Sequence, residues 1–186
     1  MSTPVDLILL AGGASRRFGS QKLLASFEGK PLYRYALDAA DCGLEDCRVL
    51  VVTNLPPLRE EAASRGYELV EAPPPDEGIA ASMRAGVMAA RPEAVLCFLV
   101  CDQPHFPATA LHDFVTAFLE SGRLLGTVSS GDRRGNPAAF RPALREELLS
   151  LRGDRGGSQL FRRYEEELFS FQLPAQYLED YDHPWA

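Results

Sequence analysis

A short stretch near the start of the chain combines flexible backbone with positive charge. It contains two adjacent glycines and then, within ten residues, a hydroxyl and three cations: Gly12, Gly13, Ser15, Arg16, Arg17 and Lys22. Adjacent glycines let backbone amides approach a phosphate closely, and the side chains add further donors. The spacing is neither the dinucleotide fingerprint nor the P-loop. A surface loop with solvated arginines has the same composition, but a position directly after an apolar strand favours a phosphate-binding loop.

One carboxylate, Asp102, directly follows the apolar run Val95–Val100. A carboxylate at the end of a buried strand can bridge, through a hard divalent cation, to a triphosphate. Capping the next helix is the alternative role for such a side chain. The metal role is favoured because the sequence also offers a basic loop that could bind the triphosphate. Mg²⁺ usually takes one or two protein carboxylates, so a second one must converge on the site. Asp180 and Asp182 are the candidates.

Three further segments lie beside predicted strands or helix starts. Gly78 and Ser82 open a predicted helix, where free amides and a hydroxyl can approach the base or sugar of a nucleotide. Gly135-Asn136-Pro137 precedes a short predicted strand, and a segment containing Asp154 precedes a helix. The alternative for Gly78 and Ser82 is a plain helix start. The other two segments are either a turn or cap, or a wall for a second phosphorylated substrate.

The cysteines and histidines show no spacing typical of a metal site, a disulfide framework or a catalytic triad. We interpret all of them as structural: Cys42, Cys47, Cys97, Cys101, His105, His112 and His183.

Composition narrows the class of protein. The 186 residues carry a formal charge of −7, with 46% hydrophobic and 24% charged residues, which fits one globular domain over residues 1–186. An acidic balance argues against a protein that coats nucleic acid or anionic lipid. The longest apolar run, Ala94–Cys101, is too short for a membrane span, and the N-terminus does not resemble a secretory leader. We expect a cytoplasmic protein.

The elements that must position these residues alternate between β-branched apolar runs and segments of helical period. This alternation predicts an α/β fold with a mostly parallel sheet and helices on both faces, whose ligands bind beyond the carboxyl ends of the strands. The predicted strands are Val5–Leu10, Arg48–Thr53, Glu68–Glu71, Val95–Val100, Thr127–Ser129, Ala138–Phe140 and Leu168–Leu173. The predicted helices are Leu32–Asp41, Leu58–Arg65, Ile79–Ala90, Ala108–Ser121, Pro142–Leu151 and Ser158–Glu166.

The motifs together resemble the MobA-like nucleotidyltransferases, which complete the molybdenum cofactor. The most specific match is LILLAGGASRRFGSQKLL over Leu7–Leu24, similar to the family's strand followed by L-A-[AG]-G-x-S-x-R-[MF]-G-x-x-K. Shorter matches follow in the expected order: Gly29-Lys30-Pro31-Leu32, Gly78-x-x-x-Ser82-x-x-x-Gly86, Asp102-Gln103-Pro104, Gly135-Asn136-Pro137, Leu151-Arg152-Gly153-Asp154 and Asp180-Tyr181-Asp182-His183-Pro184.

The resemblance implies a Rossmann-like domain that transfers a nucleoside monophosphate from an NTP to the terminal phosphate of molybdopterin cofactor and releases pyrophosphate. It implies Mg²⁺ bound by Asp102 and Asp182, and catalysis by Arg17, Lys22 and Asp102. It places the nucleotide against Leu10, Ala11, Gly12, Gly13, Ser15, Arg17, Lys22, Gly78 and Ser82, and the acceptor against Gln103, Gly135, Asn136, Pro137 and Asp154. A molybdoenzyme or its cofactor-insertion chaperone is the expected partner protein.

Different motifs resemble family branches that use different nucleotides. Four motifs look like the cytidylyl branch: Lys22-Leu23-Leu24, Ser82, Asp102-Gln103-Pro104 and Gly135-Asn136-Pro137. In contrast, Leu10-Ala11-Gly12-Gly13 has a second glycine typical of the guanylyl branch. We expect CTP to be the better donor, with GTP also used because Gly12 leaves room for a purine. The alternatives are a guanylyltransferase, transfer to a sugar phosphate or methylerythritol phosphate, and a nucleotide-binding regulator without transfer activity.

Overall fold

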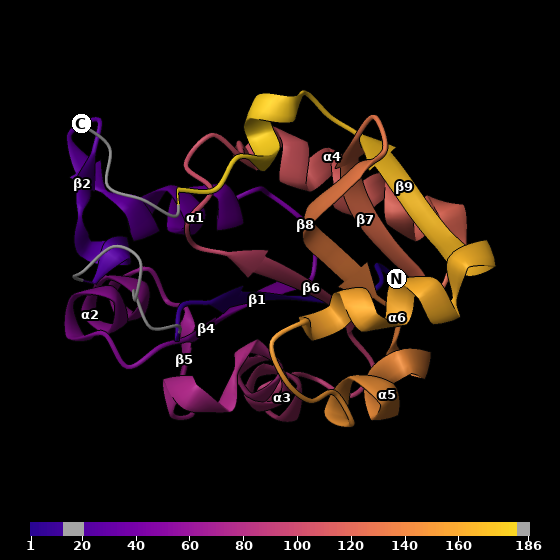
Figure 1. Cartoon of the computed structure of the whole chain (residues 1–186), viewed down its shortest axis with the longest axis horizontal. Helices are drawn as coiled ribbons and strands as arrows, with labels where there is room; N and C mark the ends of the chain where they lie inside the picture. Colours follow the sequence, from indigo (N-terminus) through magenta and orange to yellow (C-terminus); the bar gives the residue numbers. More distant parts are fainter. Residues whose placement is uncertain (13–20, 182–186) are drawn as a thin grey trace.

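The computed structural model describes residues 1–12 and 21–181. Its centre is a seven-stranded sheet of order β5-β4-β1-β6-β8-β7-β9, accompanied by a two-stranded ribbon, β2-β3 (Figure 1). The strands are β1 (Val5–Leu10), β2 (Ser26–Phe27), β3 (Lys30–Pro31), β4 (Cys47–Val52), β5 (Glu68–Val70), β6 (Val95–Val100), β7 (Leu125–Ser130), β8 (Arg133–Phe140) and β9 (Leu168–Gln172). The α-helices are α1 (Leu32–Ala40), α2 (Pro56–Ser64), α3 (Ile79–Ala89), α4 (Ala108–Ser121), α5 (Arg145–Leu149) and α6 (Gln159–Arg163). The short 3₁₀ turns are η1 (Lys22–Leu24), η2 (Pro75–Glu77), η3 (Pro142–Leu144), η4 (Gly156–Ser158), η5 (Glu165–Glu167) and η6 (Ala175–Leu178).

The sheet is parallel where the predicted site lies. β1 pairs in parallel with β4 and β6, and Leu10 lies opposite both Val52 and Val100. The three strands therefore end level with one another, and the loops that follow them share one edge of the sheet. β8 is the antiparallel member, paired with both β6 and β7.

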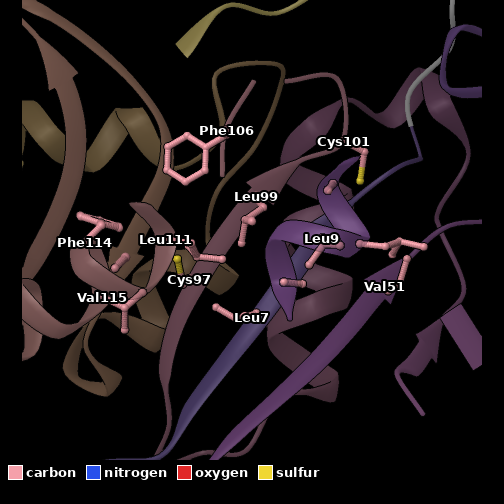
Figure 2. Packing of buried hydrophobic residues seen from close by; sticks show 14 of the residues in the cluster. Leu7, Leu9, Val51, Cys97, Leu99, Cys101, Phe106, Leu111, Phe114 and Val115 are labelled. Carbon is pink, nitrogen blue, oxygen red and sulfur yellow. The ribbon is translucent and has the colours of Figure 1, made fainter. Parts of the chain in front are cut away.

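Helices cover both faces of the sheet, as the alternating pattern predicts. Leu7 and Leu9 point into a core with α1, α2 and α4, whereas Ile8 points into a second core with α3, α5 and α6. Strand side chains alternate between the two faces, so one apolar strand supplies both cores. Figure 2 shows the first core, where side chains of β1, β4 and β6 pack with those of α4. The predicted α/β class is confirmed.

Most predicted elements shift by one or two residues at an end, and three differ more. β8 begins at Arg133, five residues before the predicted start, so Gly135-Asn136-Pro137 lies inside a strand instead of preceding one. The predicted helix Ser158–Glu166 is divided, because Tyr164 leaves the helical conformation and its hydroxyl donates to Glu147. The predicted helix Pro142–Leu151 is shorter, a turn of 3₁₀ helix followed by α5.

Within residues 1–12 and 21–181, every helix is too short or too polar to cross a bilayer. All four cysteines lie in this part of the chain and carry free thiols, in agreement with a structural role. Burial raises the pKa of the Cys101 thiol, next to Asp102 in the sequence, so this sulfur stays protonated.

Candidate active site

A cleft of about 420 Å³ opens at the carboxyl ends of β1 and β6, where the sequence analysis expected ligands to bind. Its walls combine apolar backbone-rich segments with three carboxylates and one ammonium group. The lining residues are Leu10, Ala11, Gly12, Lys22, Leu23, Pro75, Asp76, Gly78, Ile79, Ser82, Val100, Cys101, Asp102 and Asp154.

Lys22 and Asp102 face each other in this cleft. The Lys22 ammonium donates to Asp102 Oδ2 at 2.8 Å, and the two side chains are only 15% and 19% exposed. Lys22 comes from η1, and Asp102 follows the last residue of β6 by two positions. The structure thus brings together the predicted phosphate cation and the predicted metal carboxylate.

Asp102 has no capping role in the adjacent helix. The residue before α4 is Pro107, and no side chain caps that helix by a hydrogen bond. The capping alternative is therefore excluded, and the carboxylate of Asp102 remains directed at Lys22 in the cleft.

Gly12 lies where β1 gives way to the basic loop. Ala11 is held on both sides, because its amide donates to the Val52 carbonyl at 3.0 Å and its carbonyl accepts from Thr53 Oγ1 at 3.2 Å. A Cβ on Gly12 would lie 2.9 Å from Ala72 Cβ and 3.1 Å from Ser82 Oγ. The expected room for a purine is therefore not present at this position, because Ala72 and Ser82 fill it. This glycine lets the strand and α3 approach each other.

Gly78 opens α3 with a positive φ of 82°, and Asp154 lies across it. A Cβ on Gly78 would be 2.6 Å from Asp154 Oδ1 and 2.7 Å from the Gly153 carbonyl, so a larger residue is excluded. The Ala80 amide donates to the same carbonyl at 3.1 Å. Asp154 is thus placed with the predicted nucleotide residues Gly78 and Ser82, instead of with the other predicted acceptor residues.

The remaining predicted acceptor residues lie outside the cleft lining. Gln103 is buried, and its amide donates to the Leu178 carbonyl at 3.3 Å. Pro137 borders a separate, much smaller cavity together with Gln103, and Gly135 packs against Leu178. This geometry gives Gln103 and Gly135 a structural role in seating the C-terminal segment. Asn136 lies in β8 and is half-buried.

Several predicted residues fall on parts of the chain that the structure does not describe. Gly13, Ser15, Arg17 and Asp182 lie outside residues 1–12 and 21–181, and their roles stay predictions. Within the described residues, no group of three or more His, Cys, Asp or Glu side chains forms a metal site. The hard oxygens of Asp102 fit Mg²⁺ or Mn²⁺, provided that substrate phosphates complete the coordination.

The sequence analysis assigned no role in the site to Pro75, Asp76 or the backbone of Tyr181. Asp76 and Pro75 line the cleft from η2, next to Gly78, and their position before a helix start was the available signal. The Tyr181 amide donates to the Asp102 carbonyl at 3.2 Å, which no local pattern could indicate.

Comparison with known proteins identifies the family of this chain. The MobA-like NTP transferase domain matches residues 7–168. The protein named molybdenum cofactor guanylyltransferase from Serratia proteamaculans is 31% identical over 163 residues, which span 83% of this chain and 78% of that protein. The crystal structure of Rv0371c from Mycobacterium tuberculosis superposes with a TM-score of 0.82 at 22% identity, covering 97% of this chain and 94% of that one. A manganese complex of Rv0371c superposes with a TM-score of 0.73 at 18% identity, covering 92% and 89%. The chain belongs to the MobA-like NTP transferase family.

Proposed function

We propose that this nucleotidyltransferase moves a nucleoside monophosphate from an NTP to the terminal phosphate of molybdopterin cofactor. The observation that carries the proposal is the Lys22–Asp102 pair in a cleft at the ends of β1 and β6. One cation for phosphate and one carboxylate for a metal are the charges that phosphoryl chemistry requires. The name of the Serratia relative supports molybdopterin cofactor as the acceptor.

The reaction needs positioned charge more than acid–base chemistry. A terminal phosphate oxygen of the acceptor attacks the α-phosphorus of the NTP, and the bond from that phosphorus to the oxygen bridging it to the β-phosphorus breaks. Pyrophosphate leaves with the electron pair of that bond. Negative charge grows on the equatorial and leaving oxygens, where Lys22 from η1 and Arg17 from the preceding loop are proposed to donate.

Asp102 is proposed to hold the divalent cation, with Asp182 as the second carboxylate. When bound, such a cation neutralises developing charge on phosphate oxygens. The manganese complex of Rv0371c supports a divalent ion in this fold. Our choice for this chain is Mg²⁺, because Mg²⁺ is usually bound by one or two carboxylates together with substrate phosphates.

CTP is the nucleotide we propose, and GTP is the second candidate. Lys22-Leu23-Leu24 and the Ser82 motif favour CTP, and the contacts of Ala72 and Ser82 around Gly12 remove the argument for extra room beside a purine. GTP is favoured by Leu10-Ala11-Gly12-Gly13 and by the names of curated relatives in Serratia proteamaculans and Histophilus somni. The product dinucleotide would then pass to a molybdoenzyme or to its cofactor-insertion chaperone.

A donor and acceptor matrix tests the proposal. CTP, GTP, ATP and UTP are each combined with Mg²⁺ and with molybdopterin cofactor, a sugar phosphate or methylerythritol phosphate, and pyrophosphate release is measured. We expect release only with molybdopterin cofactor, and fastest with CTP. Release with another acceptor would reassign the substrate. Thermal stabilisation by NTP and Mg²⁺ without release from any combination would indicate a binding protein instead of an enzyme.

A further inference from the structure

We propose that Phe27, His105 and Tyr181 form a clamp that positions Asp102 for the divalent cation. The inference rests on the proposed function, since it takes Asp102 as the metal carboxylate. It adds three positioning residues that lie outside the cleft lining and that the motif analysis did not assign to the site. The proposal also assigns a role to the β2-β3 ribbon, which the sequence analysis did not predict.

The clamp starts from the backbone of Asp102 itself. β6 ends at Val100, so Asp102 lies beyond the hydrogen-bonded ladder of the sheet. Its carbonyl accepts a hydrogen bond from the Tyr181 amide at 3.2 Å. A residue far along the sequence therefore fixes the peptide that carries the site carboxylate.

An aromatic cluster holds Tyr181 in place. The Tyr181 ring lies 4.8 Å from the Phe27 ring and 5.9 Å from the His105 ring, measured between centroids, and Phe27 and His105 are 5.6 Å apart. His105 Nε2 and the Tyr181 hydroxyl are hydrogen-bonded at 3.0 Å. Each of the three rings thus contacts the other two, and His105 follows Asp102 by three positions on the same loop.

Phe27 is buried and comes from β2, which exists only by pairing with β3. The Tyr35 hydroxyl of α1 donates to the Phe27 carbonyl at 2.6 Å, and the two rings pack edge to face at 5.7 Å. The ribbon is therefore anchored to α1, and it presents a fixed apolar ring to the C-terminal segment.

A second attachment holds the same segment a few residues earlier. Gln103 donates to the carbonyl of Leu178, whose side chain is buried against Gly135. The loop after β6 and the C-terminal segment are thus joined at three places, through the Asp102 carbonyl and through the side chains of Gln103 and His105. Mutation of residues that hold a metal ligand in place, without contacting the metal themselves, typically weakens metal affinity by about 10- to 100-fold.

The test compares variants of Tyr181 with a matched tyrosine on the same segment. Tyr181→Ala removes the ring and the hydroxyl. Tyr181→Phe keeps the ring but removes the hydroxyl that bonds to His105, and Tyr177→Ala removes a ring that contacts Phe106 instead. Mn²⁺ affinity is measured by electron paramagnetic resonance with a non-hydrolysable CTP analogue bound. Affinity for the analogue without metal is measured separately.

We expect Tyr181→Ala to weaken Mn²⁺ binding by about 10-fold or more, Tyr181→Phe by a smaller factor, and Tyr177→Ala by less than about twofold. Affinity for the analogue without metal should change by less than about twofold in all three. Equal Mn²⁺ affinity in Tyr181→Ala and wild type, or an equal loss in Tyr177→Ala, would overturn the clamp.

Two further variants protect the test against a folding defect in Tyr181→Ala. His105→Gln can still hydrogen-bond the Tyr181 hydroxyl, so it should bind Mn²⁺ more tightly than His105→Ala, whereas equal binding would count against the clamp. A wild-type protein that transfers nucleotide while its clamp variants bind Mn²⁺ normally refutes the clamp alone. A wild-type protein that binds neither analogue nor Mn²⁺ refutes the proposed function.

Discussion

The ammonium nitrogen of Lys22 lies 2.8 Å from Oδ2 of Asp102, although 80 positions separate the two residues. The pair neutralises both side chains in a partly enclosed cleft. A cation that binds Oδ2 of Asp102 displaces Lys22 from this oxygen, and the triphosphate offers Lys22 a new partner. Nucleotide and metal are expected to strengthen each other's binding. Either ligand alone breaks the Lys22–Asp102 ion pair and takes this partner from one of the two charges, whereas both together give each charge a new partner.

Replacing Lys22 separates these two effects. Lys22→Met keeps the length of the side chain without its charge, so nucleotide-free protein should bind Mn²⁺ about threefold or more tightly than wild type. The same variant should bind CTP more weakly. Lys30→Met is the control, since Lys30 pairs with Asp38 and does not line the cleft. Titration calorimetry measures both ligands, and weaker Mn²⁺ binding by Lys22→Met would refute the competition.

Gly12 is expected to tolerate no side chain, because Ala72 and Ser82 already occupy the space. Gly12→Ala should cost about 1–3 kcal/mol of unfolding free energy and should weaken binding of both CTP and GTP through displacement of Ser82. The double variant Gly12→Ala/Ala72→Gly should recover part of both losses. Urea denaturation and nucleotide titration check the two expectations. A stable Gly12→Ala protein with an unchanged affinity for both nucleotides would contradict this expectation, because it would show that a methyl group fits between residue 12, Ala72 and Ser82.

Asp6 supports the opposite end of the sheet. Its buried carboxylate accepts from the Arg91 amide at 2.7 Å and from Arg91 Nε at 2.9 Å. Asp6→Asn should lower the free energy of unfolding by about 3 kcal/mol, because it removes the buried carboxylate partner of Arg91, whose side chain is only 20% exposed. Asp46→Asn is the control, since Asp46 binds the same arginine but is 44% exposed, and it should cost less than about 1 kcal/mol.

The site lies at the other end of β1, so the folded Asp6→Asn protein should keep the transfer rate of wild type. Urea denaturation gives the stability, and pyrophosphate release gives the rate. A loss in Asp46→Asn as large as that in Asp6→Asn would contradict the burial argument.

The thiols give a pH-dependent prediction. Burial raises the pKa of Cys47 from 9.0 to about 12, and it also raises the pKa of Cys42 and Cys97. A raised thiol pKa favours the neutral form, so at pH 8 nearly all of Cys47 is the unreactive thiol. Native protein should therefore react with iodoacetamide much more slowly than unfolded protein at pH 8, and the rate for native protein should still be rising as the pH approaches 12. Rapid modification of the native protein at pH 8 would contradict this burial.

The sequence predicted the parts of the fold that depend on local pattern. β1, β6 and α4 have the predicted bounds, because their apolar periodicity is strong and each ends at a clear change of composition. The start of β8 was missed because Arg133 and Arg134 have a polar, exposed pattern that predicts no strand. They pair with Ser130 and Ser129 of β7, so it is the partner strand that makes them extended.

The site was predictable to a similar extent. Lys22, Asp102, Gly78 and Ser82 were predicted from their places after strands or before helices, and the structure gathers them in one cleft. The burial of Gln103 under the C-terminal segment was not predictable, because it depends on Leu178, which is distant in the sequence. Long-range contacts of this kind have no signature in one sequence.

The most direct test of the central claim measures dinucleotide product from wild type and Asp102→Asn. Each protein receives equal concentrations of CTP and GTP with Mg²⁺ and molybdopterin cofactor, and product is read by mass. We predict mainly the cytosine dinucleotide from wild type, with equivalent pyrophosphate, and a rate at least about 100-fold lower from folded Asp102→Asn. A product that is mainly guanine dinucleotide would overturn CTP as the donor. The absence of any dinucleotide from folded wild type, or Asp102→Asn turning over at the wild-type rate, would contradict the proposed transferase site.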